Sequence, residues 1–186
     1  MRLSTVIFVA AVLLVSGIVY SAPKPSEDFA ISIKKTAPWH VAYQKFTGPY
    51  SGVPKAIGQV DSWVRKYNLV LLGPVLSEYY NSPMEVDSTK LEWAIMFPIL
   101  EPLTGFPKET EGEVSIKRLD PVQVAYTYHQ GPYQEVGGTY MKLFQWVFQN
   151  GYQVAGPMRE LYWSDPQNTP EDKLISELQV PVTKGQ

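Results

Sequence analysis

Few residue types in this chain could carry out chemistry. Its 186 residues include no Cys and only two His, His40 and His129. This composition excludes a disulfide framework, thiolate metal sites, Cys catalysis and a His-rich metal cluster. Candidate chemistry therefore depends on carboxylates and on the 12 Tyr and 5 Trp, whose flat apolar rings also carry a polar atom. We expect no metal site and no cofactor.

An internal repeat shows which of these residues are unusual. Val41–Tyr50 reads VAYQKFTGPY, and Val124–Tyr133 reads VAYTYHQGPY. Held at this offset of 83 without a gap, residues 31–99 and 114–182 agree at 20 of 69 positions, against roughly 4 expected by chance. The chain thus contains two copies of one unit, and positions that differ between the copies are the candidates for function.

Glu177 is such a position. It lies four residues before Pro181, whereas the residue four before Pro98 is Ala94. Alternation along the expected strand places Glu177 on the face opposite to Leu178, where an acid would need a cation, a water or a hydroxyl as its partner. Spacing alone favours a solvent-exposed acid, since most strand acids are exposed.

Aromatic residues could form the walls of a binding groove and attract a cation through their ring faces. Trp93 is the first candidate, because Ser176 occupies its position in the second copy. Six other candidate ring-bearing residues are Tyr43, Tyr80, Tyr126, Tyr140, Tyr162 and Trp163. Many strand aromatics only fill the core, and Trp63 and Trp146, which share one repeat position, are expected there. His129 precedes a Gly-Pro turn, where a structural role is favoured over catalysis.

Each copy predicts the order strand, helix, strand, strand. The predicted strands are 40–46, 75–80 and 91–99, then 123–129, 158–163 and 174–182, with helices at 53–67 and 136–150. Two such units can bury their apolar faces only by pairing about a pseudo-twofold axis, which leaves a groove between them. We therefore expect an α+β fold of two repeats, at 31–99 and 114–182, with antiparallel sheets and one main helix each. Residues 100–113 would link the repeats.

The N-terminal segment is expected to enter a membrane. Residues 3–20 carry no charge, and Arg2 precedes them. Their length lies between that of a signal-peptide core and that of a transmembrane helix. Poor cleavage signals favour an uncleaved anchor at 1–22, followed by a tether at 23–29, and the charge of Arg2 would direct the domain to the non-cytoplasmic side. The alternative is a secreted or periplasmic protein after signal cleavage.

The ordered motifs resemble the GyrI-like small-molecule-binding domain, which is the effector-binding domain of multidrug-responsive transcription activators. The resemblance covers about residues 30–183 and rests on the tandem repeats, on HQGPY at His129–Tyr133, on the Gly-Pro-then-Tyr strands and on ELQVPV at Glu177–Val182. It implies an aromatic groove between the halves, with a carboxylate at the base of the groove. This groove would bind lipophilic and often cationic compounds. Carried over by position, it assigns Glu177 to that groove. Some relatives are hydrolases of strained cyclopropane compounds.

Three functions remain open. The first is a membrane-tethered or exported domain that binds lipophilic or cationic small molecules. The second is a protein-interaction module of a membrane complex, and the third is a hydrolase in which Glu177 activates water with help from Tyr126. Binding is favoured, because the sequence offers no second acid, no nucleophile with a nearby base and no metal set. The net charge of −2, the scattered basic residues and the absence of a recognisable helix-turn-helix argue against nucleic acid.

Overall fold

The structure, a computed structural model, describes residues 29–102 and 113–185. The predicted anchor at 1–22, nearly all of the tether and most of the linker lie outside the described residues. The first repeat contains β1 (Ser32–Lys35), β2 (Trp39–Thr47), α1 (Val53–Lys66), β3 (Val75–Tyr79) and β4 (Glu92–Ile99). The second contains β5 (Ser115–Leu119), β6 (Gln123–Gln130), α2 (Val136–Gln149), β7 (Tyr152–Val154), β8 (Met158–Tyr162) and β9 (Ile175–Lys184).

All the strands belong to one continuous antiparallel arrangement rather than to two separate sheets. Their order is β1-β6-β9-β8-β3-β4-β2-β5, and β7 pairs with β9. The α+β class, the two repeats and their helices are confirmed, with each helix ending one residue before the predicted position. Within the described residues, no helix has the length and apolar character needed to cross a membrane.

The first strand of each repeat pairs with a strand of the other repeat. β1 pairs with β6, so that Ser32 faces Tyr126, and β5 pairs with β2, so that Ser115 faces Tyr43. These two pairings are equivalent at the 83-residue offset. The two halves therefore exchange edge strands, which sequence periodicity did not predict.

The pseudo-twofold axis passes through the centre of the sheet. Here β3 pairs with β8, and Ser77 faces Glu160, its own repeat equivalent. Because β3 belongs to the first repeat and β8 to the second, residues of the two repeats face each other along this junction. A residue that differs between the repeats therefore makes the centre of the sheet asymmetric.

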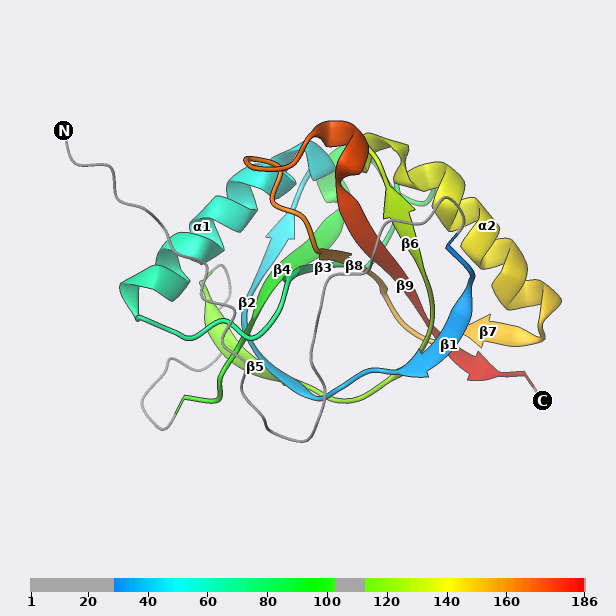
Figure 1. The fold of residues 1–186 in the computed structure, drawn as a ribbon, viewed down its shortest axis with the longest axis horizontal. Helices are drawn as coiled ribbons and strands as arrows, with labels where there is room; N and C mark the ends of the chain where they lie inside the picture. Colours follow the sequence, from blue (N-terminus) through cyan, green and yellow to red (C-terminus); the bar gives the residue numbers. More distant parts are fainter. Residues whose placement is uncertain (1–28, 103–112, 186) are drawn as a thin grey trace.

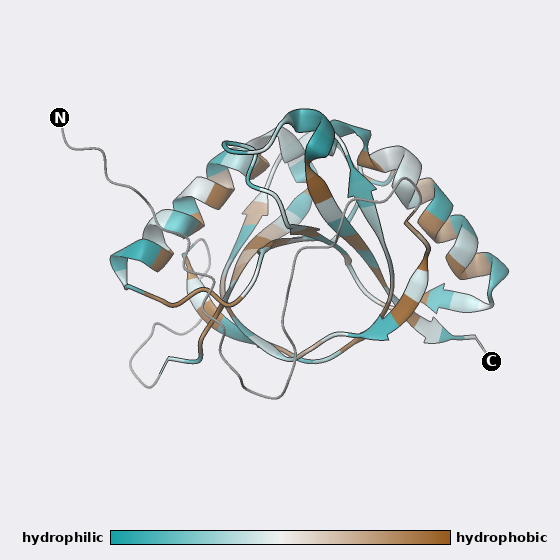
Figure 2. Cartoon of the chain, in the orientation of Figure 1, coloured by the Kyte–Doolittle hydropathy of each residue, from teal (hydrophilic) through white to brown (hydrophobic). Residues whose placement is uncertain are grey.

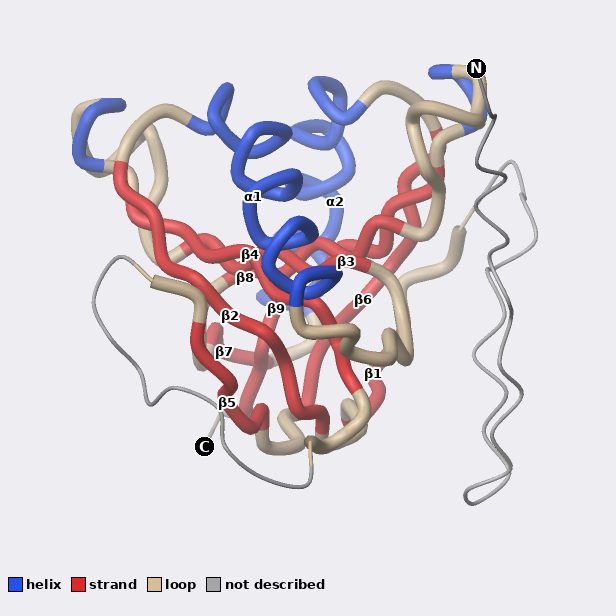
Figure 3. Tube along the Cα trace, turned by 90° about the vertical axis from the view of Figure 1, so that its left-hand side faces the viewer, coloured by secondary structure: helices blue, strands red, loops and turns tan. Residues whose placement is uncertain are grey.

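Both helices cover the same face of the sheet, and they begin near the middle of the molecule and diverge (Figure 1). We call this the helix face; a view from the side shows both helices above the strands (Figure 3). Val60 and Val64 of α1 and their equivalents Leu143 and Val147 of α2 are buried in its two cores. A third apolar cluster, which includes Tyr43, Leu76, Met96 and Leu161, occupies the opposite side, called the second face.

The Gly-Pro-Tyr turns position the start of each helix. Gly48 and Gly131 have φ values of 124° and 131°, a region that residues with a Cβ rarely adopt. Pro then leads into a single 3-10 turn, η1 (Tyr50–Gly52) or η3 (Tyr133–Glu135), directly before the α-helix. As a result, Tyr50 and Tyr133 occupy equivalent places close to the axis.

Candidate ligand site

A buried carboxylate lies on the pseudo-twofold axis. Glu160, in β8, is 7% exposed. Its Oε2 accepts hydrogen bonds from Tyr162 at 2.9 Å and from Tyr79 at 3.2 Å, and the two hydroxyl oxygens lie 2.9 Å apart. Tyr79 and Tyr162 are repeat equivalents. Symmetric tyrosines therefore converge on an acid that only one repeat supplies.

Three more tyrosines extend this group. The ring of Tyr50 lies edge-on to Tyr79 at 4.9 Å between centroids, and the ring of Tyr133 is tilted against Tyr162 at 5.1 Å. Their hydroxyls donate to equivalent carbonyls, that of Asn81 at 2.6 Å and that of Ser164 at 3.0 Å. Tyr140 of α2 donates to the carbonyl of Arg159 at 3.4 Å. We call Glu160 and its five tyrosines the axial cluster.

Burial and hydrogen bonding act in opposite directions on the Glu160 carboxyl. Burial raises the pKa of the Glu160 carboxyl, and hydrogen bonds from the tyrosine hydroxyls oppose part of this rise. Burial and the charge of Glu160 also raise the pKa of Tyr79, and burial is the main cause that raises the pKa of Tyr133 to about 12. No basic side chain of residues 29–102 or 113–185 forms an ion pair with Glu160. An ionised Glu160 would thus be stabilised by hydroxyls alone.

Glu177 has different surroundings, on the second face. It is 1% exposed and forms an ion pair with Lys34, whose ammonium also lies 4.1 Å from the centroid of the Tyr126 ring. Gln179 donates to the same Oε1 at 2.6 Å, and Oε2 has no hydrogen-bond partner among the described residues. Burial and, after it, the charge of Glu177 raise the pKa of Tyr128. Glu177 is thus already paired with a cation.

The eight residues predicted to bind a ligand are divided between the two faces. Tyr43 and Tyr80 lie on the second face, as Glu177 does, and their hydroxyl oxygens are 3.4 Å apart. The Tyr80 hydroxyl donates to Glu78 at 2.9 Å. Trp163 packs against the same second-face cluster. Tyr140 and Tyr162 belong to the axial cluster. The described residues therefore do not form one groove lined by all eight.

Trp93 occupies the core of the helix face. It is buried, it stacks on Phe46 at 4.8 Å between centroids, and its Nε1 donates to the carbonyl of Gly48 at 2.9 Å. These contacts stabilise the Gly-Pro turn that precedes α1. His129 stabilises the equivalent turn before α2, since its ring nitrogens contact Thr139 Oγ1 at 2.9 Å and the Pro132 carbonyl at 3.2 Å.

Sequence reasoning missed the centre of the axial cluster. Glu160 replaces Ser77 at the repeat offset, so the criterion that selected Glu177 would also have selected Glu160. Tyr50 and Tyr133 occupy the same repeat position, so a search for differences between the copies does not select them. Only the three-dimensional pairing of β3 with β8 shows that these residues meet.

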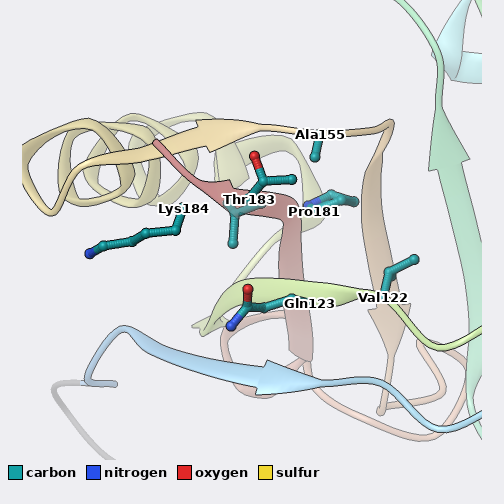
Figure 4. Close-up of a pocket in the computed structure, with 7 residues that line it drawn as sticks. Val122, Gln123, Ala155, Pro181, Thr183 and Lys184 are labelled. Carbon is teal, nitrogen blue, oxygen red and sulfur yellow. The ribbon is translucent and has the colours of Figure 1, made fainter. Parts of the chain in front are cut away.

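A hollow of about 420 Å³ lies at the far end of β9 (Figure 4). Seven residues line it: Val122, Gln123, Ala155, Pro181, Val182, Thr183 and Lys184. The charged one, Lys184, donates to the carbonyl of Asn150 at 3.0 Å. The hollow includes neither Glu160 nor Glu177, and we assign it no function. In the described part of the chain, no three His, Cys, Asp or Glu side chains gather in a way that could hold a metal ion.

Fold and site together define a two-repeat α+β domain that surrounds a buried acid with tyrosines. The family model of the GyrI-like small molecule binding domain matches residues 29–183 of this chain. The chain belongs to this family, as its motifs predicted. A comparison with curated proteins finds no match.

Solved structures share the fold. The C-terminal domain of EcmrR has a TM-score of 0.72 at 23% identity, with 84% of this chain and 98% of that chain covered. In the EcmrR–DNA complex the match, at 22% identity and the same TM-score, spans 58% of the EcmrR chain and 84% of this one. A hydrolase from Listeria innocua has a TM-score of 0.59 at 12% identity, with 82% of this chain and 91% of that chain covered. SAV2435 bound to tetraphenylphosphonium has a TM-score of 0.50 at 13% identity, with 83% and 94% covered.

Proposed function

We propose that this small-molecule-binding domain takes up lipophilic cations at the axial cluster. The observation that carries the proposal is the buried Glu160 carboxylate, which receives tyrosine hydrogen bonds but no ion pair from the described residues. A cation that entered would gain a full electrostatic partner, and aromatic ring faces would contact its apolar surface. The ionised carboxylate would repel an anion.

Glu160 suits this task better than Glu177 does. Lys34 already neutralises Glu177, so a cationic ligand would have to displace an ammonium before it gained the charge interaction. The assignment of a ligand to Glu177, Tyr126, Trp163, Tyr80 and Tyr43 stays a prediction. A lipophilic cation remains the right probe for either site, and the tetraphenylphosphonium complex of SAV2435 suggests that compound.

Calorimetric titration of the protein with tetraphenylphosphonium tests the proposal. Glu160→Gln keeps the shape of the side chain and removes its charge, so we expect the affinity to fall about tenfold or more, equivalent to about 1.4 kcal/mol. Glu177→Gln is the matched control, and it should bind nearly as tightly as the unchanged protein. Equal affinity for Glu160→Gln, or no binding by the unchanged protein, would reject the proposal.

We also propose that residues 3–20 anchor the domain to a membrane, with the domain on the non-cytoplasmic side. The support is the uncharged 18-residue run after Arg2. If the anchor is retained, the protein stays with membranes after alkaline extraction, and its mass includes residues 1–22. Release into the soluble fraction with a mass lacking these residues would show signal cleavage instead.

A further inference from the structure

One flank of α2 exposes large apolar side chains. Met141 is 75% exposed and Phe148 is 62% exposed, and the half-buried Phe144 lies between them on the helix. Spacings of three and four residues place all three on the same flank. Phe144 and Phe148 also stack, at 6.4 Å between ring centroids. We call these three residues the α2 stripe.

The first repeat shows that the fold does not require this stripe. At the same offset of 83, α1 has Gly58, Asp61 and Arg65, and the last two form a surface ion pair at 2.6 Å. The positions that form a surface ion pair on α1, Asp61 and Arg65, are thus occupied on α2 by the stacked rings of Phe144 and Phe148. Lys142 is the one charged residue of α2, so the stripe carries no acid. Brown hydrophobic segments recur along α2 in Figure 2.

The first described residues lie beside α2. Thr127 of β6 donates from Oγ1 to the carbonyl of Phe29 at 2.8 Å, and Ile31 and Ile33 pack against the core beneath α2. Figure 1 shows the start of β1 on the α2 side of the molecule. Eight residues, 21–28, separate the apolar run at 3–20 from Phe29. Fully extended, they reach at most about 30 Å.

We propose that the α2 stripe docks on the surface of the lipid bilayer that residues 3–20 enter. The short connection holds α2 near the bilayer, and the stripe offers the Phe and Met side chains that an interfacial helix inserts below the headgroups. No acid of α2 would oppose an anionic surface. The proposal rests on the membrane anchor and not on the ligand assigned to Glu160.

Docking would also bring the ligand site close to the membrane. Tyr140 stacks on Phe144 at 6.2 Å between centroids and belongs to the axial cluster. The rings of Phe148, Phe144 and Tyr140 therefore follow one another from the exposed end of α2 towards Glu160. Lipophilic compounds dissolved in the bilayer would contact these rings first.

Fluorescence quenching of the full chain in vesicles tests the docking. The protein has no native Cys, so Gln149→Cys at the end of α2 and Lys66→Cys, its equivalent at the end of α1, each accept a single bimane label. Phosphatidylcholine brominated near the headgroup is the quencher. We expect several-fold stronger quenching of the label at position 149 than of the label at position 66.

The substitution Met141→Ser with Phe148→Arg should abolish this difference, because it replaces two exposed apolar side chains. Asp61→Ser with Arg65→Ser on α1 is the matched control and should leave quenching unchanged. Thermal unfolding and tetraphenylphosphonium titration of each variant confirm that the fold is kept.

Equal quenching at the two positions, or quenching that survives the α2 substitution, overturns the proposal. Absence of quenching in protein that floats with vesicles overturns docking while it leaves the anchor intact. A chain dimer that shields position 149 from lipid assigns the stripe to a second copy instead. Protein that does not float with vesicles rejects anchor and docking together, whereas the calorimetric test of Glu160 is unaffected.

Discussion

At the scale of single residues, Glu160 and Glu177, two of the buried acids of the central strands, differ in their neighbours. Glu160 is surrounded by tyrosine hydroxyls, while Glu177 contacts the Lys34 ammonium and the Gln179 amide. A carboxylate solvated only by neutral donors loses more on burial than one with a cation beside it. Burial accordingly raises the pKa of Glu160, which links its charge to pH.

This linkage predicts a pH-dependent stability difference between the protein and Glu160→Gln. The unfolded Glu has a pKa of about 4.3, and the folded value is raised, so the folded state binds more protons between these two values. The contribution of Glu160 to the free energy of unfolding is therefore greatest in acid and falls as pH rises through that window. Thermal unfolding of both proteins across this range should show Glu160→Gln gaining relative stability with rising pH. A difference that stays constant with pH would contradict the assignment.

Affinity for a cation should change in the opposite direction. Because only the ionised carboxylate attracts tetraphenylphosphonium strongly, its affinity should fall as the pH is lowered through the raised pKa of Glu160. Titration at several pH values measures this slope, and Glu160→Gln should show little of it. An equal slope in both proteins would place the responsible group elsewhere.

Glu177→Ala separates a structural acid from a ligand-binding acid. Repeat one already has this arrangement, since Lys117 lies 4.5 Å from the Tyr43 ring centroid and Ala94 occupies the equivalent of Glu177. We expect a loss of about 1–3 kcal/mol in the free energy of unfolding. The loss stays moderate because Lys34 is 34% exposed and can regain water. Chemical denaturation measures the loss, and calorimetry should show unchanged tetraphenylphosphonium affinity; a drop as large as that of Glu160→Gln would restore Glu177 as the ligand-facing acid.

At the scale of elements, the β3–β8 junction has an ion pair on the second face. Arg159 contacts Glu78 Oε1 with Nε at 2.8 Å and with a terminal nitrogen at 2.7 Å, and both side chains are largely buried. At the repeat offset their equivalents are Leu76 and Leu161, which face each other in the same junction. The fold therefore already contains the apolar version of this pair.

We expect Arg159→Leu alone to cost about 3–5 kcal/mol, because it leaves a buried carboxylate without its cation. The double substitution Arg159→Leu with Glu78→Leu should recover most of this loss, since it copies the Leu76–Leu161 pair. Chemical denaturation of both single variants and the double variant measures the coupling. Additive losses would show that the ion pair does not act as a unit.

The elements that local pattern determines were predicted well. The apolar periodicity of α2 and the Gly-Pro-Tyr turns locate the helices to within one residue at their ends. β1 and β5 were missed because four or five residues of mixed polarity, such as SIKK, do not show the alternation of a half-buried strand. Their pairing depends on the other repeat, and no local pattern records it.

The site was harder to predict than the elements. Tyr162 and Trp163 are neighbours in sequence, yet Tyr162 contacts Glu160 on the helix face and Trp163 packs on the second face. Alternation indicates that two such residues point in opposite directions, but it does not show which direction faces the helices. For this reason Glu177 and Glu160 could not be distinguished before the helices were placed.

At the scale of the whole molecule, each half depends on the other for its sheet. β1 and β5 cross between the repeats, and β3 and β8 join them at the axis. Leu76 and Tyr79 of the first half are buried against strands that include β8. The two copies therefore share one sheet and do not form two separate domains.

This interdependence predicts the behaviour of the separated halves. Residues 24–105 and 106–186, produced apart, should each remain largely unfolded, because β1 lacks β6, β5 lacks β2 and the β3–β8 junction is missing. When mixed, the halves should regain the near-ultraviolet circular dichroism of the intact domain and elute together as one complex. The unfolding temperature of the mixed halves should then depend on protein concentration, because the folded state is a complex of two chains. A half that unfolds cooperatively by itself at the temperature of the intact domain would show instead that the exchanged strands contribute little, and the axial cluster would then have to be assembled from two domains that fold independently.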